Sequence, residues 1–325
     1  MTDELSSEQR AARLRPLVER ALESYELSSP TIELITNDWN CVFRVDDATG
    51  SRYVLRVSLP DRRTLDEVRG EIAWLAALAA ETELAVPTPL ATREGSLVVL
   101  VEHEEVPEPR ASVVFGWIDG IPLIDALTEA TVEALGATAA RLHEHALRFP
   151  VQPGLRVWNS PYPFGEPEVL FGEEHAAALE AAGRTPFERA KTATLEAIDR
   201  LGEAEPARLV HADLHEENAF VRSDGSIAIL DFDDCMIGWP AQDLGITVFG
   251  LAGRDVFEPL EAALRRGYEQ VAPWPEPFPG AVRTFAADRC LMLANHVVQD
   301  HDPEYRAAAP RYVAEWAAKI ERLLG

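Results

Sequence analysis

Hydrophobic residues recur with two different periods along the chain, and the period changes near residue 117. Before this point, an amphipathic helix, short alternating strands and a second helix are predicted at residues 6–25, 31–35, 41–45, 52–57, 65–80, 97–102 and 112–117. After it, helical spacing prevails at residues 129–145, 187–201, 257–271, 281–296 and 310–324, with one strand pair within residues 219–232. Residues 150–167, rich in proline and glycine, predict an irregular connection. We therefore expect an α+β fold with a small antiparallel sheet in residues 1–116 and a larger, mainly helical lobe in residues 117–325.

Bulk composition limits the location and the partners. The 325 residues contain no apolar run near the roughly 18 residues of a membrane span, and the three cysteines are far apart. We expect a cytoplasmic protein with reduced thiols. The formal charge of −25 disfavours nucleic acid and anionic membranes as partners. It mildly favours cationic partners, although acidity also serves solubility alone.

Residues 209–234 contain the main candidate functional residues and a predicted β-hairpin. Asp-Gly between alternating apolar runs is the preferred centre of a two-residue turn, so Asp224 and Gly225 should make Ser223 pair with Ser226. In that register Asn218 and Asp231 lie opposite each other at the open end, with Cβ atoms about 5 Å apart. Two oxygen ligands would therefore face one point.

A carboxamide and a carboxylate at one point suit Mg²⁺, a hard cation that takes oxygen ligands and completes its shell with phosphate and water. Asp213 precedes Asn218 by five residues, in the loop that leads into the hairpin. Phosphoryl transfer needs such a carboxylate to orient a hydroxyl and accept its proton. Asp213, Asn218 and Asp231 together cover both tasks.

Residues 211–218 resemble the catalytic loop of the aminoglycoside phosphotransferase family, within the eukaryotic-like kinase superfamily, and residues 231–233 resemble its metal-binding segment. The resemblance is nearest to the stress-response kinase and homoserine kinase branch. It implies a bilobal protein-kinase-like fold that uses ATP and Mg²⁺. It also implies Asp213 as the catalytic base, Asn218 and Asp231 as metal ligands, and Asp233 as a second carboxylate at the metal.

The same resemblance gives three nearby residues supporting roles. His211 would be structural, and Asp243 would hold the catalytic loop through hydrogen bonds. Glycine is usual where Ala212 stands, a departure that adds only a methyl group.

No lysine occurs before residue 191, so a cation that binds nucleotide phosphate from this part of the chain would be an arginine. Alternation on the strand at residues 52–57 places Val54 and Arg56 on one face, so Arg56 could meet phosphate while Val54 lines the adenine pocket. This strand resembles the one that carries the superfamily's nucleotide-binding lysine, with Arg56 in its place. The resemblance implies Glu71, on the following helix, as the partner of that cation. An ordinary surface ion pair is the alternative.

Two further segments are candidates for nucleotide contact. Residues 36–41 occupy the place of a glycine-rich phosphate loop and include Asn40, although a plain hairpin turn would have the same pattern. Residues 114–120 resemble the hinge between kinase lobes, which places Phe115 and Trp117 near adenine. By itself this segment is a strand followed by a turn.

The predicted function is ATP-dependent transfer of the γ-phosphoryl group to a hydroxyl of a small molecule, such as an amino alcohol, an aminoglycoside or a homoserine-like compound. Protein Ser/Thr is the runner-up acceptor, because the stress-response branch implies it. Candidates to shape the acceptor site are Trp158, Asn159, Tyr162, Phe164, Arg289, Asn295, His296, Asp300 and Asp302.

Two other functions remain open at this point. His211, Asp213 and His215, with His143 or His145, could bind zinc or manganese in a metallohydrolase, although this leaves Asn218 unexplained. A pseudokinase that binds nucleotide without transfer is suggested by Arg56 and by the missing glycine-rich loop.

Overall fold

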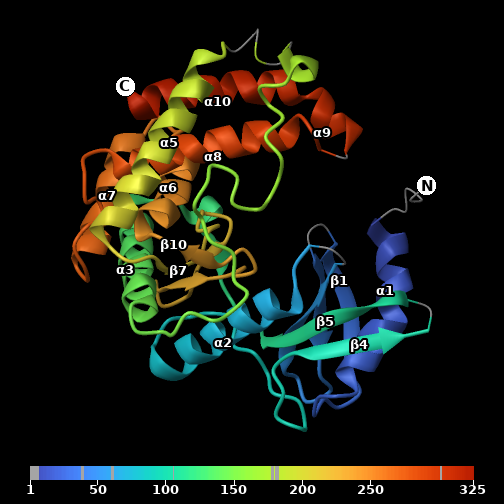
Figure 1. The fold of residues 1–325 in the computed structure, drawn as a ribbon. Coiled ribbons are helices and arrows are strands. Elements are labelled where there is room, and N and C mark those ends of the chain that lie inside the picture. Colours follow the sequence, from blue (N-terminus) through green and yellow to red (C-terminus); the bar gives the residue numbers. More distant parts are fainter. Residues whose placement is uncertain are drawn as a thin grey trace. The chain divides into compact units, whose positions relative to one another are not determined.

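The computed structural model describes residues 7–37, 40–59, 62–104, 106–176, 179, 183–300 and 302–325. The chain divides into two compact units (Figure 1). Unit 1 comprises residues 1–119 and 152–154, and unit 2 comprises residues 120–151 and 155–325. The expected α+β class, with an antiparallel sheet first and helices after it, is confirmed. No helix in these ranges combines the length and apolar character needed to cross a membrane.

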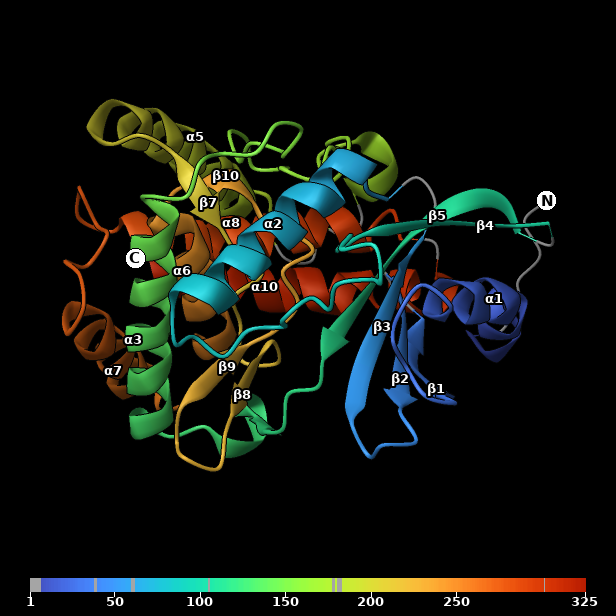
Figure 2. The same cartoon turned by 90° about the horizontal axis from the view of Figure 1, so that it is seen from below.

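Unit 1 is built on one antiparallel sheet of five strands, in the order β1-β2-β3-β5-β4 (Figure 2). The strands are β1 (Thr31–Asn37), β2 (Asn40–Asp46), β3 (Arg52–Ser58), β4 (Val99–His103) and β5 (Val106–Gly116). Two helices accompany them, α1 (Ser7–Leu22) and α2 (Leu65–Glu81). The predicted elements are all present, and β5 begins six residues earlier than expected.

The side chains of β3 alternate between the two faces of the sheet, as predicted from the sequence. Leu55 and Val57 are fully buried in one hydrophobic cluster with Val18 of α1 and Val114 of β5. Side chains at alternate positions point to the opposite face of the sheet, so Arg56 faces away from this cluster. The core of unit 1 thus fixes the direction of Arg56.

Helix α2 begins at a capping box. Glu67 N donates to the Thr64 hydroxyl at 3.2 Å, and Thr64 N donates to the Glu67 carboxylate at 2.6 Å. These bonds satisfy two backbone donors that the first turn cannot satisfy itself. The helix start is thereby fixed, and Glu71 follows one turn later.

Unit 2 is mainly helical, with α8 packed against α5, α6 and α10, and α3 packed against α7 (Figure 1). Its helices are α3 (Glu129–Ala146), α5 (Thr185–Ala204), α6 (Pro240–Leu251), α7 (Phe257–Glu269), α8 (Ala281–Val297), α9 (Pro303–Ala307) and α10 (Ala309–Leu324). Short strands form a pair of β7 (Arg208–Val210) with β10 (Met236–Gly238), and a sheet of β6 (Ile121–Pro122), β8 (Ala219–Val221) and β9 (Ile227–Ile229).

Helix α6 was not predicted. Ten of its twelve residues are buried, Gln242 and Asp243 among them, so it lacks the polar stripe that marks a surface helix. A helix surrounded by protein on all sides shows no amphipathic period. This missed helix carries residues that hold the loop at residues 211–214.

The predicted hairpin register is wrong by one residue. Ala219 pairs with Ile229 and Arg222 N donates to Ser226 O, so the loop has three residues rather than two. Gly225 has φ +83° and is the last loop residue, as in a type I turn followed by a left-handed residue. A shift of one residue moves a side chain to the other face. Leu230 rather than Asp231 therefore lies beside Asn218, to whose carbonyl it donates at 2.8 Å.

Helices α3 and α7 cross so closely that two glycines are required. A Cβ on Gly267 would lie 1.8 Å from Glu133 O, and one on Gly136 would lie 2.1 Å from Leu264 O. Both obstacles are backbone atoms, so neither can move aside without displacing a helix.

We predict that Gly267→Ala lowers the melting temperature by about 5 °C, because the helices must separate. Gly202→Ala is the matched control, since Gly202 is exposed in α5 and a Cβ there meets nothing closer than 3.9 Å. It should raise the melting temperature by about 2 °C through better helix propensity. Equal melting temperatures of the two variants in a thermal unfolding experiment would contradict the close crossing.

Candidate active site

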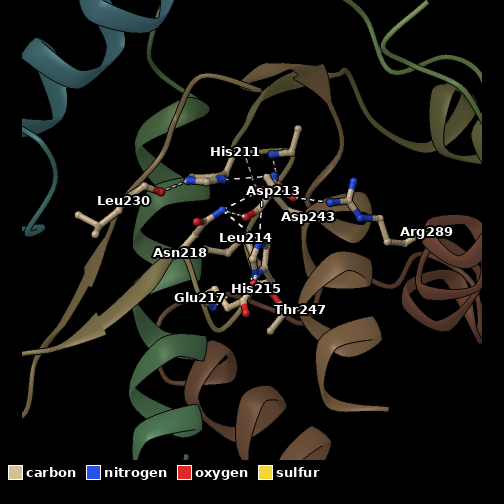
Figure 3. A network of polar contacts seen from close by, with 11 residues as sticks. His211, Asp213, Leu214, His215, Glu217, Asn218, Leu230, Asp243, Thr247 and Arg289 are labelled. Atoms are coloured by element: carbon tan, nitrogen blue, oxygen red, sulfur yellow. Dashed lines mark hydrogen bonds and ion pairs between the residues drawn. The ribbon is translucent and has the colours of Figure 1, made fainter. Parts of the chain in front are cut away.

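Residues 211–218 form a loop between β7 and β8 that α6 holds in place (Figure 3). The Asp243 carboxylate accepts hydrogen bonds from His211 N at 2.8 Å and from Ala212 N at 2.6 Å. One turn later on α6, the Thr247 hydroxyl donates to Leu214 O at 2.6 Å. Because all these groups are buried, each bond satisfies a polar group that water cannot reach. The supporting role expected for Asp243 is present.

Ala212 adopts a left-handed backbone conformation, with φ +66°. A Cβ in this region costs roughly 1–2 kcal/mol, a cost that glycine avoids. The substitution of Ala for Gly at this position is therefore a matter of backbone conformation and not only of an added methyl group. The short bond from Ala212 N to Asp243 holds the strained residue in place.

Behind Asp243, a polar chain runs to α7. His143 Nε2 donates to Asp243 Oδ2 at 2.9 Å, and its Nδ1 shares a hydrogen bond of 3.0 Å with the Tyr268 hydroxyl. Burial raises the pKa of Tyr268, which keeps it a neutral phenol. His143 is thus a buried link from α3 and α7 to the loop.

His211 connects the loop to the segment after β9. Its Nε2 donates to Leu230 O at 2.8 Å, and its Nδ1 accepts from Asp213 N at 3.2 Å. The ring also packs edge-on against Phe232, with 4.5 Å between the ring centres. Burial lowers the pKa of His211, so the ring is neutral at physiological pH. These contacts fix the two residues that flank Asp231.

The metallohydrolase alternative finds no support in this geometry. Both ring nitrogens of His211 are engaged by backbone groups, which leaves neither for a metal ion. Across the part of the chain that the structure describes, no three His, Cys, Asp or Glu side chains gather as a metal cluster.

Three side chains surround the Asp213 carboxylate. Arg289 of α8 donates to Oδ1 at 2.6 Å, Asn218 Nδ2 donates to Oδ2 at 2.8 Å, and His215 Nε2 lies 3.3 Å from Oδ2. Burial raises the pKa of Asp213, but the Arg289 charge and the His215 hydrogen bond outweigh it, and the net pKa is well below the usual range. The group is therefore an ionised acceptor of hydrogen bonds at neutral pH.

The Asn218 carboxamide has a defined orientation. Its Nδ2 donates both to Asp213 Oδ2 and to Asp213 O, at 2.8 and 3.0 Å. Only an NH₂ group can donate to two acceptors, so the amide oxygen must lie on the opposite side of the carboxamide. Figure 3 shows this oxygen pointing away from Asp213.

The predicted partners of Asn218 follow β9. Asp231 is exposed and has φ +58°, another left-handed residue, so the chain turns sharply there. Asp233 is half-buried and lies two residues beyond. Because of the corrected register, Asp231 is not the cross-strand neighbour of Asn218. Its role as a metal ligand stays a prediction.

In unit 1, one carboxylate holds two arginines. Glu71 is completely buried, and its Oε2 accepts from Arg56 at 2.7 Å and from Arg63 at 2.5 Å. Burial raises the pKa of Glu71, but the two guanidinium charges outweigh it, and the pKa is lowered. The expected pair of Arg56 and Glu71 is present, and it is buried rather than on the surface.

The other predicted nucleotide contacts lie on the same sheet or directly after it, since Trp117 follows the end of β5. Phe115 of β5 pairs with Val54 of β3, and the Arg56 guanidinium lies 5.3 Å from the Phe115 ring centre. Trp117 donates its indole N–H to Asp119 at 3.1 Å. Asn40 is buried at the start of β2. Residues 38 and 39 of the predicted phosphate loop lie outside the described residues.

The predictions from the sequence missed Arg63 and did not assign Arg289 to Asp213. Arg63 lies just before the Thr64 cap, eight residues from Glu71, a spacing with no helical meaning because the helix begins between them. Arg289 comes from α8, 76 residues from Asp213. The scarcity of lysine was the only signal that arginines must serve here.

Comparison with known proteins adds the family. A model of the phosphotransferase enzyme family matches residues 31–278, more than half of the chain. The chain belongs to this family. As a member it is a kinase, an enzyme that transfers a phosphoryl group to an alcohol oxygen. The matched range includes the loop at residues 211–218 and the segment at residues 230–233.

Individual relatives of this phosphotransferase have modest identity. Stress response kinase A of Salmonella typhi is 26% identical over 234 residues, which cover 72% of the chain and 66% of that kinase. A microcompartment-associated aminopropanol kinase is 27% identical, with a TM-score of 0.74 and coverage of 95% of the chain and 97% of that structure. An amicoumacin kinase, solved with AMP-PNP and Ca²⁺, is 20% identical, with a TM-score of 0.69 and 96% coverage of both chains, which shows a shared fold.

We predict that Asp243→Asn destabilises the phosphotransferase by about 3 kcal/mol, because the new NH₂ group faces a backbone N–H or the His143 N–H. Asp255→Asn, at an exposed position, makes the same change of charge and should leave stability within about 0.5 kcal/mol of the parent. Chemical denaturation of both variants measures the difference. A stable Asp243→Asn variant would show that the loop does not depend on this carboxylate.

Proposed function

We propose that the protein transfers the γ-phosphoryl group of ATP to a hydroxyl of a small, amine-bearing acceptor. The observation that carries the proposal is the contact between Asp213 and Asn218. One loop presents an ionised carboxylate beside a carboxamide whose oxygen points away from it. The carboxylate suits a hydroxyl proton, and the oxygen suits a hard metal ion.

Asp213 is proposed as the catalytic base. It would accept a hydrogen bond from the acceptor hydroxyl, whose oxygen forms the new bond to phosphorus while the bond from phosphorus to ADP breaks. The hydroxyl proton passes to Asp213. Because Arg289 holds the pKa of Asp213 low, the carboxylate is a weak base, and the proton moves only as the new bond makes the oxygen more acidic. Arg289 also fixes the direction of the carboxylate.

The proposed metal ligands fit a divalent cation. Asn218, Asp231 and Asp233 offer only oxygen donors, which Mg²⁺ prefers and Zn²⁺ does not require. A bound cation would neutralise charge on the phosphate oxygens of the nucleotide. The contacts of His211 with Leu230 and Phe232 support this assignment, because they hold the segment that carries the two carboxylates.

The cluster of Arg56, Glu71 and Arg63 is proposed to bind nucleotide phosphate. Two guanidinium groups and one carboxylate have a net charge of +1, as a lysine would. Arginine grips both carboxylate and phosphate with paired nitrogens, so it can keep Glu71 while it binds an anion. Val54, Phe115, Trp117 and Asn40 remain the predicted contacts for the rest of the nucleotide.

The acceptor class rests on similarity and on charge. The aminopropanol kinase matches nearly the whole chain, and its name describes an acceptor with one amine and one hydroxyl. The formal charge of −25 is compatible with a cationic acceptor. Protein Ser/Thr is the second candidate, because stress response kinase A is also similar.

We predict that Asp213→Asn reduces transfer from ATP by at least about 100-fold and leaves nucleotide affinity within about 2-fold, because the proton acceptor is lost while the proposed phosphate-binding arginines are unchanged. Asp224→Asn, in the exposed hairpin turn, is the control of equal charge. Radiolabelled ATP with amino alcohols, aminoglycosides, homoserine and protein extract gives activity and acceptor together.

Removal of divalent cations with EDTA should abolish phosphoryl transfer, and addition of Mg²⁺ should restore it. Full activity of Asp213→Asn would exclude the mechanism, and nucleotide binding by the parent without any transfer would favour a pseudokinase.

We predict that Arg63→Gln weakens ATP binding about 10-fold, because one charged contact to phosphate is lost. Glu71 keeps Arg56, so the fold should survive, with a melting temperature within a few degrees of the parent. Arg69→Gln removes an exposed arginine from α2 and should leave the affinity unchanged. Calorimetric titration with ATP measures both. Equal affinities of Arg63→Gln and Arg69→Gln would restrict phosphate binding to Arg56.

A further inference from the structure

Residues 215–218 form a turn that ends at Asn218. His215 O accepts a hydrogen bond from Asn218 N at 3.1 Å, which places Glu216 and Glu217 at the two central positions. These two glutamates have opposite surroundings, since the side chain of Glu216 is 10% exposed and that of Glu217 is 68% exposed. A carboxylate as buried as that of Glu216 needs partners in the protein.

The Glu216 carboxylate lies between an arginine and the end of a helix. Its Oε1 accepts from Arg254 Nη2 at 2.8 Å. Its Oε2 lies against Gly250 in the last turn of α6, where a Cβ on Gly250 would approach it to 2.0 Å. The carboxylate therefore occupies space that any residue larger than glycine would fill.

This end of α6 is itself held by two cations of α10. Lys319 Nζ donates to Phe249 O at 3.1 Å, and Arg322 Nη1 donates to Ala252 O at 2.9 Å. Carbonyl groups at the end of a helix lack helical partners, and positive charge is favourable there. The surface against which Glu216 packs is therefore fixed from outside the loop.

Glu216 is attached through its backbone as well. Its carbonyl accepts from Ile124 N at 3.2 Å, and Leu214, two residues before it, is bound to α6 through its own carbonyl. Residue 216 thus has both its carbonyl and its carboxylate held, which fixes its orientation. The turn transmits this orientation to Asn218, two residues later.

We propose that Glu216 is a positioning residue for the metal site, which sets the direction of the Asn218 carboxamide through its contacts with Arg254 and Gly250. Mg²⁺ demands a near-ideal octahedron, so a displaced oxygen ligand binds it poorly. The inference rests on the proposed function, in which Asn218 is a metal ligand, and adds a residue that acts on the metal only through Asn218.

The test measures kcat together with the affinity for Mn²⁺, an oxygen-binding substitute for Mg²⁺ whose free form is counted by electron paramagnetic resonance. Asn218→Ala identifies the proposed metal site and should weaken Mn²⁺ binding at least about 10-fold. Glu216→Gln should weaken it about 5-fold and lower kcat about 10-fold, with KM for the acceptor unchanged. Glu203→Gln, exposed on α5, makes the same change of charge and should behave as the parent.

Two further variants separate position from charge. Arg254→Gln removes a positive charge, so charge alone would tighten Mn²⁺ binding, whereas loss of the ion pair should weaken it about 5-fold. Gly250→Ala keeps both charges but displaces the carboxylate, and it should also weaken binding about 5-fold. Its melting temperature should stay near that of the parent, because alanine favours the helix. Gly253→Ala, where a Cβ meets nothing closer than 3.8 Å, is its matched control.

The double variant of Glu216→Gln and Arg254→Gln should bind Mn²⁺ no more weakly than either single variant, because both remove the same contact. Arg254→Gln and Gly250→Ala decide the question if Glu216→Gln does not fold. Parent Mn²⁺ affinity and kcat in the folded variants overturn the proposal, even with a lowered melting temperature, which would show a structural role alone. The proposed function then stands if Asn218→Ala binds Mn²⁺ weakly. Parent affinity in Asn218→Ala overturns both, because Glu216 would have no metal ligand to position.

Discussion

The loop formed by residues 211–218 depends on one buried carboxylate, that of Asp243. Residues 211–218 form no regular helix or strand, so their backbone groups must find partners outside secondary structure. Asp243 accepts two of these N–H groups, and Thr247 on the same helix donates to a carbonyl of the loop. Helix α6 thereby supplies hydrogen-bond partners that a neighbouring strand would supply in a sheet. Its near-complete burial makes this support rigid, and it holds Ala212 in a conformation that an isolated chain would avoid.

Other contacts follow from the position of this loop. His211 reaches Leu230 and Phe232, which fixes the chain on both sides of Asp231. Asp213 meets Asn218 within the loop and Arg289 from α8. Residues 211–218, residues 230–232 and helix α8 are distant in sequence, and these contacts bring them together at one loop. Because each contact is buried or nearly so, its electrostatic effect is larger than it would be in water, and its loss would be costly.

In unit 1, two arginines share one buried carboxylate. A lysine is a compact point charge, whereas a guanidinium group offers several donors in one plane. Glu71 therefore binds two arginines through a single oxygen, and the cluster keeps a net positive charge. The family resemblance implied a lysine at the position of Arg56, and the structure adds a second cation, Arg63, at the same carboxylate.

Local patterns determined much of this protein by themselves. Alternation on β3 placed Val54 and Arg56 on one face of the strand, and the spacing of Asp213 and Asn218 indicated phosphoryl transfer, whereas the pairing of Glu71 with Arg56 was implied by the family resemblance. These features depend on neighbours within a few residues, so the sequence contains them directly. The register of β8 and β9 was not determined in this way, because an Asp-Gly pair fits both a two-residue loop and a three-residue loop that ends in a left-handed residue, as Gly225 does here. Helix α6, the contact of Arg63 with Glu71 and the contact of Arg289 with Asp213 were decided by tertiary structure. They join residues from separate elements, and a sequence pattern shows which face of an element is buried but not which side chains it meets there.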